Sequence, residues 1–235
     1  MVEFMKALIK CHYNYLINKT TILLFVFVIL ISISTFVLNV FTLDENLTYQ
    51  ESNAIYFHSS FMTIKMIIIF LSIFLICNIF LPKNNQYYYL ISYNVSRRLY
   101  FITKISLVFS LEITFVFLLF MFYHLIGFIG YDKYQFDCGT ILSFFNLWLL
   151  LIFYSFLALI VFLLIKNNYI VLVIFSIFIF SMILNEDNSL FASLINFFIL
   201  YLKEDGTYYY KEYHALFSIS ALFLINLYVY DIFDL

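Results

Sequence analysis

The sequence has few charged residues and few of the residues that form flexible linkers. Only 11% of its 235 residues are charged, and it contains four glycines and one proline. An ordinary soluble domain has about 25% charged residues. So few charged groups cannot cover a globular surface, so we expect lipid to surround most of the chain. The shortage of glycine also excludes long flexible linkers and glycine-rich phosphate-binding loops.

Several classes of site also lack their sequence motifs. The three cysteines are scattered and odd in number, so they predict neither a disulfide framework nor a CxxC metal pair. The sequence has no G-x-x-x-x-G-K-[ST], H-E-x-x-H or G-x-S-x-G motif. We therefore expect no enzyme activity and no cofactor in this chain. The net charge of −2, without a long basic run, argues against nucleic acid as a partner.

Hydrophobic residues make up 65% of the sequence and gather in long runs. A bilayer core about 30 Å thick requires about 20 apolar residues per helix. The runs predict an all-α integral membrane protein, with one transmembrane domain over residues 1–235 and six transmembrane helices. We expect these spans at about 21–41, 61–81, 102–127, 141–165, 169–184 and 214–233.

Two regions next to the spans are less regular. Residues 1–19 are too polar to cross a bilayer, and their pattern predicts a helix lying in the interface. A disordered positive leader is the alternative. The run at 169–184 is marginal for a span, and the next apolar piece, at 189–202, is too short. We interpret this piece as a re-entrant or interfacial segment before the last span, with two short spans as the alternative.

Lysine and arginine alternate between the loops in a way that predicts orientation. They are concentrated before the first span and in the 82–104 loop, whereas the 42–60 loop has three acidic residues and no Lys or Arg. Cytoplasmic loops carry the excess of Lys and Arg. We therefore expect both termini in the cytoplasm and a location in the bacterial cell membrane, in contact with its lipid.

The 82–104 loop, "LPKNNQYYYLISYNVSRRLYFITK", has a helical pattern as well as positive charge. Tyr89, Leu90, Tyr93 and Arg97 lie at i, i+1, i+4 and i+8, and Pro82 can begin a helix. A short amphipathic helix of this kind can insert aromatic side chains into a groove on a partner protein. The alternative is that Arg97 and Arg98 only fix the topology.

The end of this loop resembles the permease subunits of ABC-2 type ATP-binding-cassette exporters. In that family a Pro-Val-Ser-Arg stretch is followed, several residues later, by a lysine at the mouth of the third span. Val95, Ser96, Arg97 and Lys104 match this pattern in order and spacing, whereas Asn94 stands where the family has proline.

The resemblance implies that residues 83–98 form a coupling helix that docks on a separate ATPase subunit. That subunit would bind ATP and Mg²⁺, and the permease would pair with a second copy or a sister permease. The implied cargo is a small amphipathic or antimicrobial peptide; drugs, sodium and lipid-linked glycan are alternatives. A non-transporting membrane immunity or sensor protein is a further alternative. The residues implied in coupling are Tyr89, Leu90, Tyr93, Val95, Ser96, Arg97 and Arg98.

Two charged residues lie well inside predicted spans, away from the span ends. Glu112 is about ten residues into the third span, roughly 15 Å deep and near the midplane. Lys65 lies about five residues inside the second span, and its side chain can extend outward or reach toward Glu112 if spans two and three are adjacent. The two residues are therefore candidates for a buried ion pair or for the translocation path. A carboxylate at that depth costs at least about 2–3 kcal/mol, so it requires a partner or a proton. A buried ion pair or hydrogen bond, a translocation-path role and a neutral buried acid are the three interpretations of Glu112.

Overall fold

The computed structural model describes most of the chain as long antiparallel helices. The described residues are 9–10, 12–14, 16–43, 48–81, 96–132, 134–184, 200, 202–203, 205–208 and 212–232. The helices are α2 (Lys19–Phe41), α3 (Tyr49–Ile79), α5 (Arg97–Gly130), α6 (Gly139–Ile165), α7 (Asn168–Leu184) and α9 (Glu212–Ile232). Within the described residues there is no strand, only one isolated bridge between Leu202 and Tyr208.

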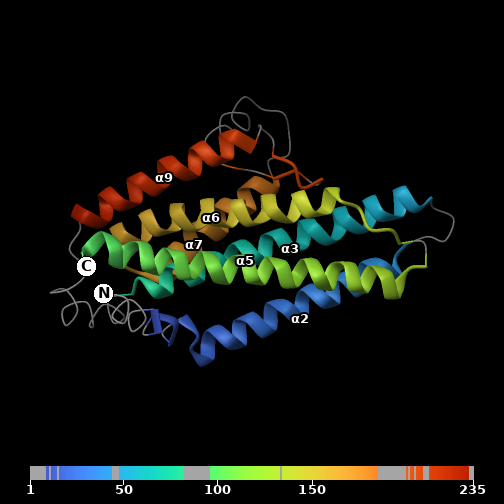
Figure 1. The fold of residues 1–235 in the computed structure, drawn as a ribbon, viewed down its shortest axis with the longest axis horizontal. Coiled ribbons are helices and arrows are strands. Elements are labelled where there is room, and N and C mark those ends of the chain that lie inside the picture. The colour runs from blue at the N-terminus through green and yellow to red at the C-terminus, as the bar shows by residue number, and fades with distance from the viewer. Residues whose placement is uncertain are drawn as a thin grey trace.

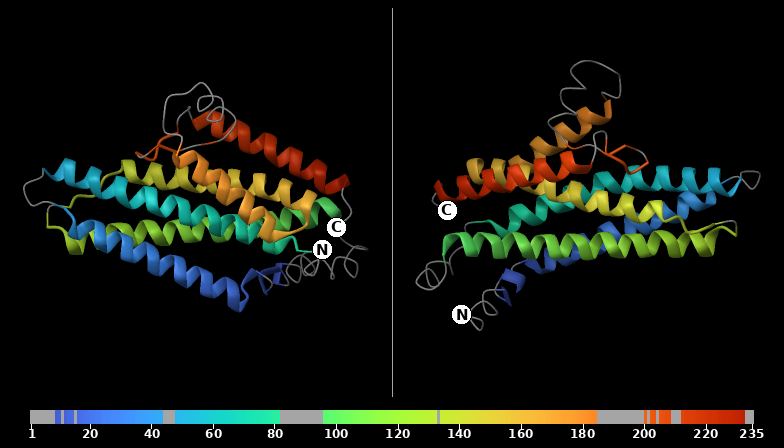
Figure 2. Two further views of the ribbon diagram at one scale, coloured as in Figure 1. Left: turned by 180° about the vertical axis from the view of Figure 1, so that it is seen from behind. Right: turned by 45° about the horizontal axis from the view of Figure 1, so that its top comes forward.

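The helices form a bundle around α6 (Figures 1 and 2). Helix α6 packs against α3, α5, α7 and α9, and α2 packs on the far side against α3 and α5. Hydrophobic residues cover the whole circumference of α6, which is typical of a helix buried on all sides. Helix α2 instead exposes apolar side chains such as Leu23, Phe27 and Phe41, as a lipid-facing helix does.

Five of these helices are long and apolar enough to cross a membrane: α2, α3, α5, α6 and α9. They include the runs predicted at 21–41, 102–127, 141–165 and most of 214–233. Helix α7, predicted as a span at 169–184, has 17 residues and extends about 25 Å, slightly less than the bilayer core. The predicted re-entrant piece at 189–202 lies mostly outside the described residues.

Helix α3 differs most from the prediction, because it begins at Tyr49 and not near residue 61. Thr48 and Glu51 form a capping box, in which the Glu51 carboxylate accepts hydrogen bonds from the backbone and side chain of Thr48. This cap satisfies donors that the first helical turn leaves unpaired. The expectation of a loop over the whole of 42–60 is therefore wrong. The 31-residue helix is about 46 Å long, so its polar beginning extends past a bilayer core.

The N-terminal segment is helical at 9–10 and 12–14 and packs against the bundle. His12 and Leu16 are buried, and the His12 ring lies edge-on to Tyr100 of α5, with 4.8 Å between ring centroids. Asn18 then caps α2 by accepting a hydrogen bond from the backbone of Thr21. The predicted amphipathic segment therefore has a protein-facing side as well as an exposed one.

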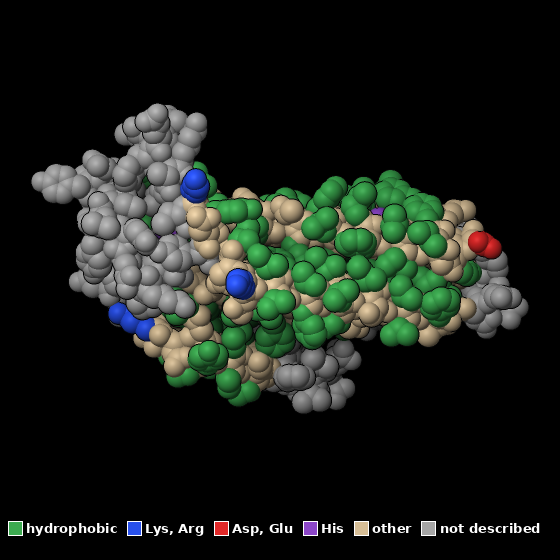
Figure 3. All heavy atoms as spheres, turned by 90° about the horizontal axis from the view of Figure 1, so that it is seen from below, with side chains coloured by type: hydrophobic (Ala, Val, Ile, Leu, Met, Phe, Trp, Pro, Cys, Tyr) green, Lys and Arg blue, Asp and Glu red, His purple; other side chains and the backbone are tan. Residues whose placement is uncertain are grey.

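Opposite charges gather at the two ends of the bundle. We call the end that carries Arg97 and Arg98 the arginine end; here α3 and α6 end, α2 and α5 begin, and α9 ends. The acidic end is defined by Glu51, Asp132, Asp137 and Asp205. On the face drawn in Figure 3, hydrophobic side chains cover the middle, Lys and Arg lie toward one end and acidic side chains lie at the other.

Candidate functional site

The described part of the predicted coupling region is the beginning of α5. The Ser96 side chain accepts a hydrogen bond from the backbone of Leu99 and caps the helix. Arg97 lies over the ring of Tyr230, 5.0 Å from its centroid, and Arg98 Nε lies 2.9 Å from an oxygen of Asp231. Both arginines therefore hold the beginning of α5 against the end of α9. The other predicted residues, Tyr89, Leu90, Tyr93 and Val95, lie outside the described residues.

Lys104 lies on α5 about two turns after Arg97, and its side chain is fully buried. Its Nζ atom lies 4.9 Å from the centroid of Phe80 and 4.7 Å from that of Tyr100, within cation–π range. Burial, with a smaller contribution from the positive charge of Lys104, lowers the pKa of His12 to about 3. A neutral His12 therefore packs beside the buried lysine at neutral pH.

Glu112 joins three helices in the centre of the bundle. Its Oε1 atom lies 2.5 Å from Ser72 Oγ on α3 and 2.8 Å from Ser155 Oγ on α6. The two serine oxygens are 2.6 Å apart, and Ser72 also lies 3.3 Å from the carbonyl of Leu151. The second carboxyl oxygen of Glu112 is buried and has no hydrogen-bond partner. Glu112 itself is only 2% exposed.

The number of available protons decides which form of Glu112 suits this cluster. The cluster has four contacts: each serine with Glu112, the two serines with each other, and Ser72 with the carbonyl of Leu151. If the carboxyl group is ionised, only the two serine hydroxyls supply protons, so at least two of these contacts have no proton. A protonated carboxyl group supplies a third proton and removes a buried charge that has an unpaired oxygen. The geometry therefore favours the neutral buried acid, hydrogen-bonded between α3, α5 and α6.

Lys65 takes part in a different set of contacts. Its Nζ atom donates to the carbonyl of Leu202, 2.8 Å away, and lies 3.2 Å from the sulfur of Met62. Ser72, which contacts Glu112, is seven residues further along α3, or about 10 Å. The structure therefore does not join Lys65 and Glu112, and Lys65 instead fastens the 202–208 segment to α3.

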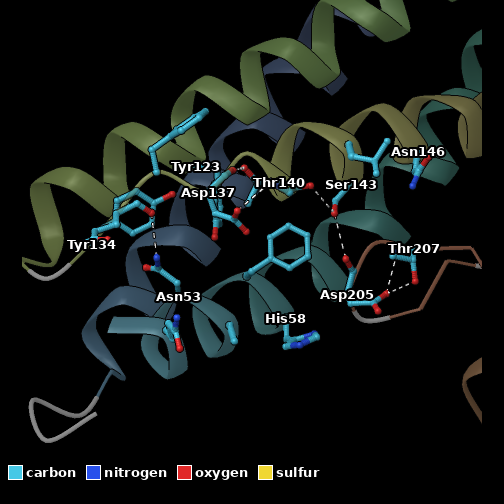
Figure 4. Close-up of a pocket in the computed structure, with 17 residues that line it drawn as sticks. Asn53, His58, Tyr123, Tyr134, Asp137, Thr140, Ser143, Asn146, Asp205 and Thr207 are labelled. Carbon is cyan, nitrogen blue, oxygen red and sulfur yellow. Dashed lines mark hydrogen bonds between the residues drawn. The ribbon is translucent and has the colours of Figure 1, made fainter. Parts of the chain in front are cut away.

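A pocket of about 570 Å³ lies at the acidic end between three segments. The first part of α3, the connection from α5 into α6 and the turn at 205–207 form its walls. Figure 4 shows Asn53 and His58 on α3, Asp137 and Thr140 at the beginning of α6, and Asp205 on the third wall. The described residues contain no group of three His, Cys, Asp or Glu side chains suited to a metal ion.

Hydrogen bonds from α6 hold the third wall of the pocket in place. Ser143 Oγ donates to the carbonyl of Asp205 at 3.1 Å, and Asn146 Nδ2 donates to the carbonyl of Gly206 at 3.0 Å. The hydroxyl of Tyr208 donates back to the carbonyl of Asn146 at 2.7 Å. Gly206 has a φ of 74°, and a Cβ atom there would overlap Ser143. Only glycine fits this turn without strain.

Hydrogen bonds also hold the connection between α5 and α6 in place. The hydroxyl of Tyr134 lies 2.6 Å from His124 Nδ1, and Thr140 Oγ1 lies 3.1 Å from His124 Nε2. Asn53 Nδ2 on α3 donates to the carbonyl of Gln135 at 3.0 Å. Burial raises the pKa of the Tyr134 hydroxyl well above its usual value, so this group stays protonated. The pocket is therefore preformed on all three sides.

Sequence reasoning did not identify this pocket. Its residues come from 50–58, 123, 134–146 and 205–207, which no local motif connects. The available signal was an excess of polar residues where α3 and α6 begin, including Asn53, His58 and Asn146. Comparisons of the chain with protein families, characterised proteins and solved structures find no match.

Proposed function

We propose that this protein is the transmembrane permease subunit of an ATP-driven exporter of the ABC-2 type. Six helices span the bacterial cell membrane, and the arginine end faces the cytoplasm with both termini. Five long apolar helices support the membrane location. The excess of Lys and Arg at one end and of acidic residues at the other supports the orientation, because cytoplasmic ends carry the positive charge.

The observation that carries the proposal is the contact of Arg97 and Arg98 with the end of α9. Residues 82–95 lead directly into Ser96, the cap of α5. A displacement of that segment would therefore move α5 and, through the two arginines, α9. Helix α9 packs along α6, around which the other helices gather, so the displacement reaches the centre of the bundle. An ATPase subunit docked on residues 82–95 requires such a mechanical connection between its docking site and the centre of the bundle.

The ATPase is a separate subunit, and ATP and Mg²⁺ bind to it. A single permease exposes an apolar α2 surface, and a second copy or a sister permease covers part of it in the working transporter. Two permeases allow alternating access, in which one half moves against the other. The cargo proposed from the resemblance is a small amphipathic peptide.

The second candidate is a membrane receptor or immunity protein that works without an ATPase. The preformed pocket at the acidic end favours it, because such a pocket can bind a ligand without any motor. The two candidates share the fold and the orientation. They differ in whether the arginine end holds an ATPase.

Co-purification from the native membrane separates these candidates. The tagged protein is solubilised gently, and mass spectrometry identifies a bound subunit that has a phosphate-loop motif. We expect the ATPase with the wild type, and less of it with Tyr93→Ala. Tyr213→Ala, which changes an exposed tyrosine at the far end of α9, is the matched control and retains the ATPase. Failure of the wild type to retain any ATPase would favour the second candidate.

A further inference from the structure

We infer that the pocket at the acidic end binds an organic cation, specifically an ammonium or guanidinium group carried on an apolar body. The lysine or arginine side chain of an amphipathic peptide has this chemistry. The inference comes from the charge, the unpaired acceptors and the aromatic side chains of the lining. Only the identification of this ligand with an exported cargo rests on the proposed function.

The charge of the lining is negative. Asp137 and Asp205 come from different walls, and the lining residues that the structure describes include no Lys or Arg. Burial raises the pKa of Asp205, but hydrogen bonds from Thr207, with smaller effects of Lys203 and His58, outweigh it and keep this pKa below its usual value. Asp205 is therefore a carboxylate at neutral pH. Two like charges beside one low-dielectric pocket attract a positive ligand.

Unpaired acceptor atoms give a second, independent indication. Asn146 is 1% exposed. Its Nδ2 donates to the carbonyl of Gly206, whereas its Oδ1 is buried and has no hydrogen-bond partner. Asn53 has the same pattern: its Nδ2 donates to Gln135, and its Oδ1 is buried and unpaired. Both asparagines line the pocket. Both oxygens are enclosed by protein atoms, so their partial negative charge acts on the pocket through space. Because no donor offsets this charge, it adds to the negative potential of the lining and favours a positive ligand such as an ammonium or guanidinium group.

The remaining lining suits the apolar part of such a ligand. Phe57, Tyr123, Tyr134 and Phe136 contribute aromatic rings, which bind apolar groups and attract cations over their faces. A volume of about 570 Å³ is in the usual range for an organic ligand and is much larger than a bare metal ion. The described residues also contain no group of three His, Cys, Asp or Glu side chains that could hold a metal. An organic cation therefore fits better than a metal ion.

The test uses phenethylammonium as the probe and 2-phenylethanol as its uncharged analogue. Binding to the wild-type protein in lipid nanodiscs is measured by titration calorimetry, with empty nanodiscs as the control for partitioning. We expect phenethylammonium to bind at least about tenfold more tightly than 2-phenylethanol, because one charge-assisted contact contributes roughly that difference in affinity. Equal affinity for the two probes would overturn the inference, and so would displacement of the ammonium probe by Mg²⁺ at lower concentration.

Charge-removing variants then locate the site. Asp137→Asn and Asp205→Asn each keep the oxygen that accepts from Gly139 or from Thr207, so they remove the charge with little structural change. We expect about fivefold weaker binding of phenethylammonium in each. Asp132→Asn, an exposed carboxylate outside the pocket lining, is the control and leaves the affinity unchanged. Unchanged affinity in both pocket variants would overturn the inference even if an ATPase co-purifies with the wild type.

Discussion

The buried carboxyl group of Glu112 gives the sharpest test of the core. If Glu112 is a neutral acid shared between Ser72 and Ser155, glutamine can replace it, because an amide of the same size also donates and accepts hydrogen bonds. Glu112→Ala instead removes the carboxyl group and leaves a cavity between three helices. The two substitutions therefore separate the size of the side chain from its charge.

The expected magnitudes follow from the contacts. Each hydrogen bond between transmembrane helices contributes about 0.6 kcal/mol, so the loss of both serine contacts costs about 1.2 kcal/mol. The cavity adds to this, and large-to-small substitutions in well-packed cores cost about 2–5 kcal/mol in total. We expect a loss of about 2–3 kcal/mol for Glu112→Ala and of less than about 0.6 kcal/mol for Glu112→Gln.

Equilibrium unfolding in mixed micelles of mild detergent and dodecyl sulfate measures these differences. Ser110→Ala on the same helix is the control, because that exposed hydroxyl bonds only to the carbonyl of Ser106 one turn earlier. A Glu112→Gln protein as unstable as Glu112→Ala would refute the neutral-acid interpretation, because it would mean that the cluster requires an ionised carboxylate. If Glu112→Gln unfolds normally but abolishes export, the translocation-path interpretation is favoured.

Three further predictions concern the two ends of the bundle. Gly206→Ala should lower the free energy of unfolding by about 2 kcal/mol, because residue 206 has a positive φ. Gly139→Ala, at a position without a positive φ, is the control and should change this free energy by less than about 1 kcal/mol. Thermal unfolding of the two variants and the wild type measures both changes. The lowered pKa of His12, about 3 in the folded protein against 6.5 when exposed, means that the unfolded chain gains a proton first on acidification. Stability should therefore fall as the pH drops below 6.5, by about 1.4 kcal/mol at pH 5.5 relative to His12→Gln, and stay level above pH 7. The Arg98–Asp231 pair is exposed, so a double-mutant cycle should give less than about 1 kcal/mol, decreasing with added salt.

The sequence predicts the positions of the long helices well, because bilayer thickness sets a minimum length of apolar run. The apolar run alone does not predict the beginning of α3, because the first turns of this helix are polar and resemble a loop in composition. Thr48 and Glu51 have the spacing of a capping box, and this signal was sufficient to place the helix start. Capping motifs of this kind predict where a helix begins, in polar segments as well as in apolar ones.

The contacts that build the pocket and the core depend on tertiary structure. Lys65 bonds to the carbonyl of Leu202, 137 positions away, and Asn146 bonds to Gly206, 60 positions away. Such pairs follow from how the helices pack, and no spacing in the sequence encodes them. The depth of Glu112 was predictable, but its serine partners on α3 and α6 were not.

The proposed function requires the arginine end to face the cytoplasm and the acidic end to face the outside, and cysteine labelling in intact cells measures this directly. Cys138 is exposed beside the pocket, and Cys77 is buried. A protein that keeps Cys138 but lacks the other cysteines should react with an impermeant maleimide from outside the cell. Arg98→Cys in a background without native cysteines should react only after the membrane is permeabilised. Labelling of Arg98→Cys from outside, or of Cys138 only after permeabilisation, would contradict the proposed orientation, and with it the docking of a cytoplasmic ATPase at the arginine end.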